Sequence, residues 1–227
     1  MRRVERPSPN FDDRRGQAVR LLVMHYTGMR TAAEALDRLT DPAAKVSAHY
    51  TIDEDGTVYV HVPEDRRAWH AGVSVWRGIT DVNAASIGIE LVNPGHEFGY
   101  RPFPPAQMAA LVELAGGILA RHAIAPRDVV GHSDVAPARK TDPGELFDWR
   151  WLATRGVGLW PAAPGPAFGG EAAYVAALSA YGYGLDGDGG HRLATMAFQR
   201  HFRPSRIDGA ADAETQGLLA ALLAACG

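Results

Sequence analysis

The densest group of side chains that could do chemistry lies at residues 131–144, GHSDVAPARKTDPG. This segment contains His132, two acidic residues that could partner it, Asp134 and Asp142, and the cation Lys140. Its prolines and glycines predict a loop of fixed backbone direction, and such loops carry function more often than packing. These residue types predict a metal-binding or hydrolytic site.

Two further candidates come at or within predicted strands. The apolar run at 19–24, VRLLVM, predicts a buried strand that delivers His25 at its end. Residues 86–92 alternate in character, which predicts a strand whose Glu90 points away from one apolar face. An ionised carboxylate is costly to bury without a partner, so Glu90 is either functional or at a solvent-exposed edge. A sheet that joins these strands could place both side chains beside the loop.

Two histidines and one carboxylate form a three-ligand zinc set with a fourth position open for water. His25 and His132 are the candidate imidazoles, and spacing alone leaves Asp134 and Asp142 as even alternatives for the carboxylate. Each residue also has an ordinary structural interpretation. A histidine at a strand end is commonly a hydrogen-bonded core residue, and a loop lysine such as Lys140 is commonly a solvated cation.

The elements that must position these residues alternate between strands and helices. Thr31 and Glu34 form a capping-box pattern that opens a helix, and Asp55 with Gly56 is a hairpin-turn signal. The alternation predicts an α/β domain built on a mixed central β-sheet flanked by helices. The expected elements are strands at 19–24, 50–52, 57–62, 86–92 and 129–131, and helices at 31–39, at 104–122 and after Asp148.

Residues 161–170, PAAPGPAFGG, can neither pack a core nor continue a helix. We expect the domain boundary there, between a larger domain at 1–160 and a small helical domain at 171–227. The small domain is expected to hold three helices, at 171–180, 193–202 and 213–225.

Composition excludes several classes of protein. The 227 residues carry a formal net charge of -3 without a long Lys/Arg block, which argues against a nucleic-acid partner. No apolar run approaches the roughly 20 residues that a membrane helix requires. The single cysteine, Cys226, excludes an internal disulfide and a C-x-x-C pair, so any metal must be held by histidines and carboxylates.

Five motifs in order over about residues 8–160 resemble the N-acetylmuramoyl-L-alanine amidases of the zinc amidase/peptidoglycan-recognition-protein type. The motifs are MHYTGM (24–29), SAHYTIDEDGTVY (47–59), AWHAGVSVWRG (68–78), NAASIGIELVNPG (83–95) and GHSDVAPARKTDPG (131–144). The resemblance implies a Zn²⁺-dependent hydrolase that cleaves the amide bond between N-acetylmuramic acid, or its 1,6-anhydro form, and L-alanine. The HYT sequence is more similar to the amidase-D branch than to the cytoplasmic anhydro-muropeptide amidases, which have Asn in place of Tyr26.

The resemblance also assigns roles. It places the third ligand on Asp142 and not on Asp134. It implies that Glu90 moves the proton from the attacking water to the leaving amine, and that Lys140 helps the zinc to stabilise the oxyanion. The implied zinc ligands are His25, His132 and Asp142. The implied substrate-binding residues are Trp69, His70, Asn83 and Arg139.

Residues 171–225 resemble a three-helix peptidoglycan-binding domain through YGYG (181–184), AFQRHF (197–202) and IDGAADAET (207–215). The alternative is three amphipathic helices that only cover the larger domain. The implied partner is peptidoglycan or a muropeptide. Two rival functions are a non-catalytic peptidoglycan-recognition module, disfavoured by the complete set of ligands and catalytic groups, and a zinc peptidase that cuts within the stem peptide.

The expected location is the cytoplasm, with the periplasm or cell envelope as the alternative. Residues 1–16 contain prolines and acidic residues where a signal peptide needs an apolar segment. A wall-binding domain would instead favour contact with intact wall. The sequence therefore leaves both soluble muropeptides and intact peptidoglycan as substrates.

Overall fold

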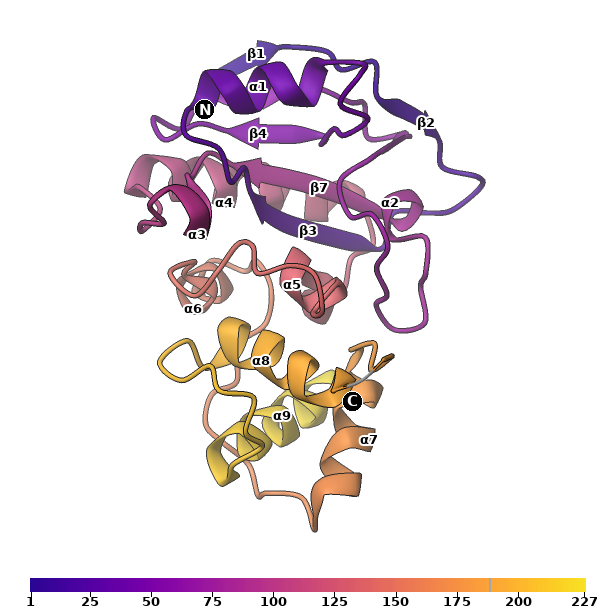
Figure 1. Cartoon of the computed structure of the whole chain (residues 1–227), viewed down its shortest axis with the longest axis vertical. Helices are drawn as coiled ribbons and strands as arrows, with labels where there is room; N and C mark the ends of the chain where they lie inside the picture. The colour runs from indigo at the N-terminus through magenta and orange to yellow at the C-terminus, as the bar shows by residue number, and fades with distance from the viewer. Residues whose placement is uncertain (188) are drawn as a thin grey trace.

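The computed structural model describes residues 1–187 and 189–227, and its centre is a six-stranded mixed sheet (Figure 1). The strand order is β1-β5-β4-β7-β3-β8, with β4 and β5 antiparallel and every other neighbouring pair parallel. Its strands are β1 (Arg3–Glu5), β3 (Leu21–Tyr26), β4 (Tyr50–Ile52), β5 (Val58–Val60), β7 (Ser86–Leu91) and β8 (Val129–Gly131). A separate antiparallel pair joins β2 (Phe11–Asp13) to β6 (Arg66–Ala68). The predicted mixed central sheet is confirmed.

Helices flank this sheet, as predicted. Thr31 caps α1 (Ala32–Thr40) by accepting a hydrogen bond from the Glu34 backbone N–H at 3.1 Å, and Asp148 caps α6 (Trp149–Thr154) by accepting one from the Trp151 N–H. The segment expected as a loop at 131–144 begins with one helical turn, α5, because Ala136 N–H bonds back to the His132 carbonyl. The helices before residue 160 are α1 (Ala32–Thr40), α2 (Val82–Ala85), α3 (Gly95–Phe98), α4 (Pro105–Arg121), the 3₁₀ turn η1 (Pro126–Asp128), α5 (His132–Val135) and α6 (Trp149–Thr154).

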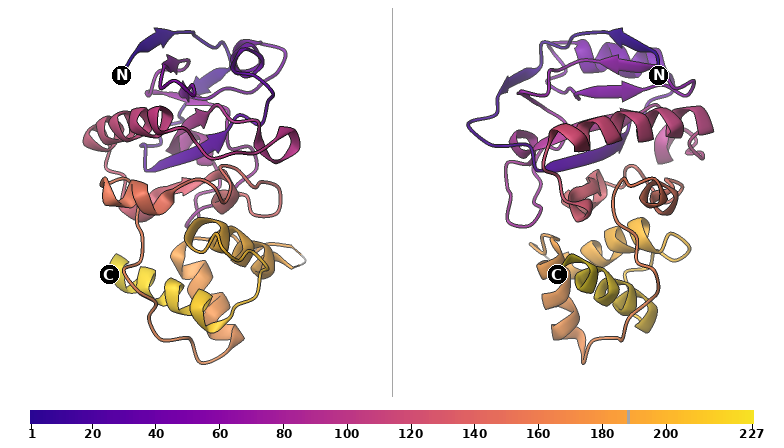
Figure 2. Two further views of the ribbon diagram at one scale, coloured as in Figure 1. Left: turned by 90° about the vertical axis from the view of Figure 1, so that its left-hand side faces the viewer. Right: turned by 180° about the vertical axis from the view of Figure 1, so that it is seen from behind.

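The two faces of the sheet carry different cores. Along β3, Leu22 and Met24 join the apolar cluster that includes α4, whereas Leu21 and Val23 join a second cluster on the other side. Figure 2 shows α4 lying across the first face. Side chains alternate between faces along a strand, so His25 continues the second set. The sheet therefore presents His25 on the face away from α4, where the strand leaves the core.

The second core extends into the C-terminal part of the chain. As predicted, the described residues of that part form three helices, α7 (Glu171–Tyr181), α8 (Gly190–Phe202) and α9 (Ala213–Cys226). Trp76 of the larger domain meets the rings of Tyr181 and Tyr183 edge-on, at centroid distances of 5.9 and 5.1 Å. The three helices thus pack against the larger domain and share a hydrophobic core with it (Figure 2). Within the described residues, no helix combines the length and the apolar content needed to cross a membrane.

Candidate metal centre and active site

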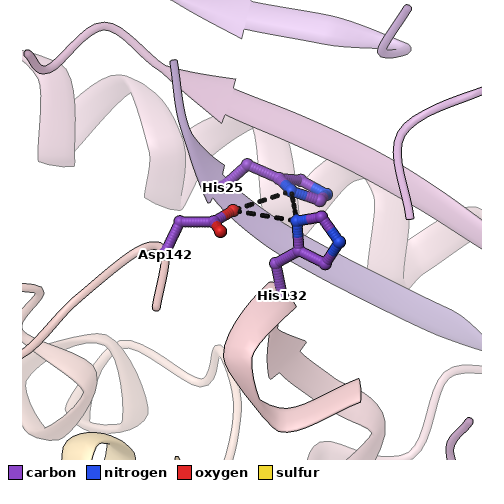
Figure 3. A group of neighbouring side chains, drawn as sticks. All are labelled: His25, His132 and Asp142. Atoms are coloured by element: carbon purple, nitrogen blue, oxygen red, sulfur yellow. Dashed lines mark hydrogen bonds and ion pairs between the residues drawn. The ribbon is translucent and has the colours of Figure 1, made fainter. Parts of the chain in front are cut away.

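Three side chains from separate parts of the chain converge on one point (Figure 3). Strands β3 and β8 are parallel neighbours with Met24 opposite Gly131, so the next residues, His25 and His132, emerge together. His25 Nδ1 and His132 Nδ1 are 3.0 Å apart, and Asp142 Oδ2 lies 3.0 and 3.1 Å from them. A tetrahedral zinc ion with bonds of about 2.0–2.2 Å separates neighbouring ligand atoms by about 3.3 Å. The triangle therefore has nearly the size that one ion would span.

The electrostatics of this cluster also suit a cation. Burial, followed by the nearby charge of His132, lowers the pKa of His25 to about 4. Burial opposes ionisation of Asp142, but the two facing imidazoles outweigh it and hold the pKa of this carboxyl below its usual range. Neutral imidazoles and ionised carboxylates are the forms that ligate a divalent ion. His25, His132 and Asp142 can hold a metal ion.

Glu90 and Lys140 line the same cleft, which has a volume of about 410 Å³. Glu90 lies opposite His25 in the register of β3 and β7, so both side chains project from the same face of the sheet. Its Oε2 is buried and has no hydrogen-bond partner among the described residues. Burial, then the charge of Asp142, raises the pKa of Glu90 well above its usual value. A carboxyl group in this environment is suited to accept and return a proton.

The residues predicted to bind substrate lie within the segment at 69–71 or contact it. Trp69, His70 and Arg139 line both the cleft and a neighbouring hollow of about 390 Å³, and Asn83 lines the hollow alone. Asn83 is buried, and its Oδ1 accepts the backbone N–H groups of His70 and Ala71 at 3.0 and 2.8 Å. Arg139 donates to the carbonyl oxygens of Ala71 and Val73. Their contact with a substrate stays a prediction.

A polar group on the rim of the cleft was not predicted. The Tyr26 hydroxyl lies 3.0 Å from His96 Nδ1 and 3.2 Å from Thr141 Oγ1, and His96 Nε2 lies 3.1 Å from Glu145 Oε2. The Tyr26 ring packs so closely that a Cβ on Gly95 would lie 2.6 Å from it. This close approach explains the glycine, but it depends on contacts between distant segments that no sequence spacing shows.

A hollow larger than the cleft of the metal centre lies elsewhere. It has a volume of about 850 Å³ and lies between α6, residues 160–164 and the end of α8. None of the predicted site residues lines it. Its size therefore does not identify the place where the chemistry occurs.

Asp134, the alternative third ligand, is not part of the group formed by His25, His132 and Asp142 among the described residues. It is fully buried, and its Oδ1 accepts the Tyr183 hydroxyl at 2.7 Å. Its Oδ2 lies 2.7 Å from His201 Nδ1 and accepts the Gly131 N–H at the same distance. Asp134 thus joins the larger domain to the C-terminal helices, whereas Asp142 lies beside His25.

Replacing Asp134 by Ala is expected to lower the free energy of unfolding by about 3–5 kcal/mol, because it leaves buried polar partners from α8 and the preceding turn unsatisfied. Urea denaturation measures the loss. Asp148→Ala, which removes only the cap of α6, is the control and should cost about 1 kcal/mol. Equal losses in the two variants would show that Asp134 does not join the two parts.

Comparison with known proteins identifies the family. The family model for N-acetylmuramoyl-L-alanine amidases matches residues 15–145. The N-acetylmuramoyl-L-alanine amidase AmiD of Escherichia coli (strain K12) is 42% identical over 250 residues, covering 97% of this chain and 90% of that protein. The 1,6-anhydro-N-acetylmuramyl-L-alanine amidase AmpD of the same strain is 36% identical over 161 residues, covering 63% of this chain and 86% of that protein.

Solved structures show the same similarity. The complex of AmiD from E. coli with the substrate anhydro-N-acetylmuramic acid-L-Ala-D-gamma-Glu-L-Lys matches with a TM-score of 0.82 at 39% identity, covering 95% of this chain and 98% of that one. AmpDh3 from Pseudomonas aeruginosa in complex with anhydromuramic pentapeptide gives a TM-score of 0.81 at 34% identity, with 95% and 94% covered. Since the family model spans more than half of the chain and AmiD aligns along nearly all of it, the chain belongs to the N-acetylmuramoyl-L-alanine amidase family.

Proposed function

We propose that this chain is a zinc-dependent hydrolase that cleaves the amide bond between N-acetylmuramic acid, or its 1,6-anhydro form, and L-alanine, in the turnover or recycling of peptidoglycan. The observation that carries the proposal is the convergence of His25, His132 and Asp142 in a cleft that Glu90 and Lys140 also line. The AmiD and AmpDh3 complexes hold anhydromuramyl peptides, which supports this class of substrate.

A zinc ion held by the three ligands would supply a water molecule of lowered pKa and would polarise the carbonyl of the scissile amide. Glu90 accepts a proton from the attacking water and delivers it to the nitrogen of L-alanine as the C–N bond breaks. Lys140 donates a hydrogen bond to the carbonyl oxygen as that atom gains negative charge. Trp69 and Arg139 hold the muropeptide against the wall of the cleft.

The C-terminal helices at 171–227 serve, in this proposal, as a wall-binding part that extends the amidase domain at 1–160. The support is their resemblance to a peptidoglycan-binding domain and the alignment with AmiD, which covers 97% of this chain. The cytoplasm stays the predicted location. Rates on intact sacculi and on soluble anhydro-muropeptides, compared side by side, test which of the two is the preferred substrate.

Zinc content is the direct test of the metal centre. The purified protein is expected to contain about one zinc ion per chain by elemental analysis, and His25→Ala, His132→Ala and Asp142→Ala should each lose it, because each removes one of three ligands. Asp134→Ala is the control: it is expected to be less stable, but the folded protein should keep its zinc, since the side-chain partners of Asp134 are Tyr183 and His201 and not the three ligands. Zinc loss in the Asp134 variant with retention in the Asp142 variant would overturn the ligand assignment.

Product analysis separates the proposed enzyme from its rivals. Mass spectrometry of a muropeptide digest is expected to show the intact stem peptide with a free L-alanine amine. Fragments cut within the stem peptide would indicate a peptidase. Binding without any product, by protein that contains zinc, would indicate a recognition module.

A further inference from the structure

We propose that the segment at 69–71 orients the metal-binding histidines without itself touching the metal. Within it, His70 is a positioning residue, which holds His25 in the tautomer that leaves Nδ1 free for the metal. This proposal rests on the metal site proposed above. It gives His70 a role other than the predicted contact with substrate.

A chain of hydrogen bonds, the His70 relay, fixes the direction of every proton between the sheet and His25. The Val82 carbonyl oxygen can only accept, so the Ser86 hydroxyl, 2.6 Å away, donates to it. The Ser86 oxygen then accepts from His70 Nε2–H at 3.1 Å, which leaves the lone pair of His70 on Nδ1. His70 Nδ1 lies 3.0 Å from His25 Nε2 and accepts its proton. A neutral imidazole carries one ring proton, so His25 Nδ1 keeps its lone pair.

The adjacent residue does the same for the second imidazole. His132 Nε2 lies 3.0 Å from the Ala71 carbonyl oxygen and must donate to it, because that oxygen has no proton. His132 Nδ1 therefore also keeps its lone pair. Consecutive residues, His70 and Ala71, thus orient both histidines toward the same point.

The segment is itself firmly held. Asn83 of α2 accepts the backbone N–H groups of both His70 and Ala71. A Cβ on Gly88 of β7 would lie 2.5 Å from His70 Cγ, so only glycine leaves room for the imidazole at this point. Ser86 is fully buried at the start of β7. These contacts fix the position of the His70 ring before any substrate binds.

The consequence is a dependence of metal affinity on residues that do not touch the metal. In the other tautomer His25 would direct an N–H group at His132 and Asp142 and could not ligate. Partners that hold a ligating histidine in place typically change metal affinity by about 10–100-fold. An effect of this size is expected from the relay.

Zinc affinity, measured by competition with a chelating dye, tests the proposal. His70→Phe and Ser86→Ala are expected to weaken zinc binding by about 10–100-fold, and His70→Gln should recover part of the loss because its amide oxygen can accept the same hydrogen bond. His61→Phe is the matched control. His61 likewise has hydrogen-bond partners at both ring nitrogens, but these are the Arg6 carbonyl and Thr51, so its replacement should leave zinc affinity unchanged.

Nitrogen-15 NMR of the metal-free protein gives a second readout that needs no zinc. In the unsubstituted protein His25 is expected to carry its proton on Nε2, and in Ser86→Ala and His70→Phe a larger share should carry it on Nδ1. Unchanged zinc affinity and tautomer, with a raised KM for muropeptide, would overturn the proposal and make His70 a substrate contact. If the unsubstituted protein bound no zinc, the proposed metal site would fail, whereas the tautomer of His25 would still report on the relay.

Discussion

Glu90→Gln is expected to lower kcat by about 100–10,000-fold while the protein keeps about one zinc ion per chain. The amide has nearly the shape of the carboxyl group but cannot accept the proton of the attacking water. The fold should be retained, because Glu90 Oε2 is buried with no hydrogen-bond partner among the described residues, and a neutral amide costs less to bury there than a carboxylate. Steady-state kinetics on a soluble muropeptide, together with zinc analysis, measure both quantities.

Lys140→Ala belongs to the same experiment and is expected to lower kcat by about 100–1,000-fold, the usual cost of removing one donor to an oxyanion. KM should change little, because Lys140 acts on charge that exists only in the transition state. Lys45→Ala is the matched control, since Lys45 lines the neighbouring hollow but not the cleft of the metal centre. A raised KM with unchanged kcat would make Lys140 an anchor for a substrate carboxylate.

Local patterns were enough to predict the elements that deliver the site. The apolar run before His25 became β3, and the alternation around Glu90 put Ile87 and Ile89 into the core shared with α4. The helix expected at 104–122 is α4, with limits one residue inside the prediction at each end. These elements are encoded locally, because each has enough residues to show its period.

The contacts around the site depend on long-range packing, and spacing could not predict them. Asp134 and Asp142 are equivalent in the sequence, and the partners that distinguish them, Tyr183 and His201, lie 49 and 67 residues from Asp134. The strands β1, β2 and β6 carry no apolar run or turn signal of their own, and they form through pairing between segments that are distant in the sequence. The relay through His70 likewise requires α2 and β7 to meet the segment at 69–71.

The sequence predicts that the C-terminal helices form a domain of their own. In the structure, these helices share an apolar cluster with the larger domain. Trp76 and Val135 of the larger domain lie in one apolar cluster with Leu178 and Phe198 of the helices. The Arg77 N–H also bonds to the Gly182 carbonyl, and the ring of His201 stacks on Trp149 at 3.9 Å. The composition of 161–170 predicts a domain boundary but gives no information about the surfaces on either side of it, and in the structure the Gly165 N–H of this segment bonds to the Gly217 carbonyl of α9.

Removing residues 171–227 is therefore expected to yield a chain that aggregates or fails to fold. Each large apolar side chain loses about 1.5–3 kcal/mol when it returns to water, and a protein is stable by only about 5–15 kcal/mol, so uncovering several of them at once exhausts that margin. The control keeps every residue: a protease site placed within 161–170 is cut after folding, and the two fragments should stay together in size-exclusion chromatography until urea is added. A truncated chain that is soluble, holds zinc and unfolds cooperatively would show instead that the larger domain is independent and that the shared core contributes little to its stability.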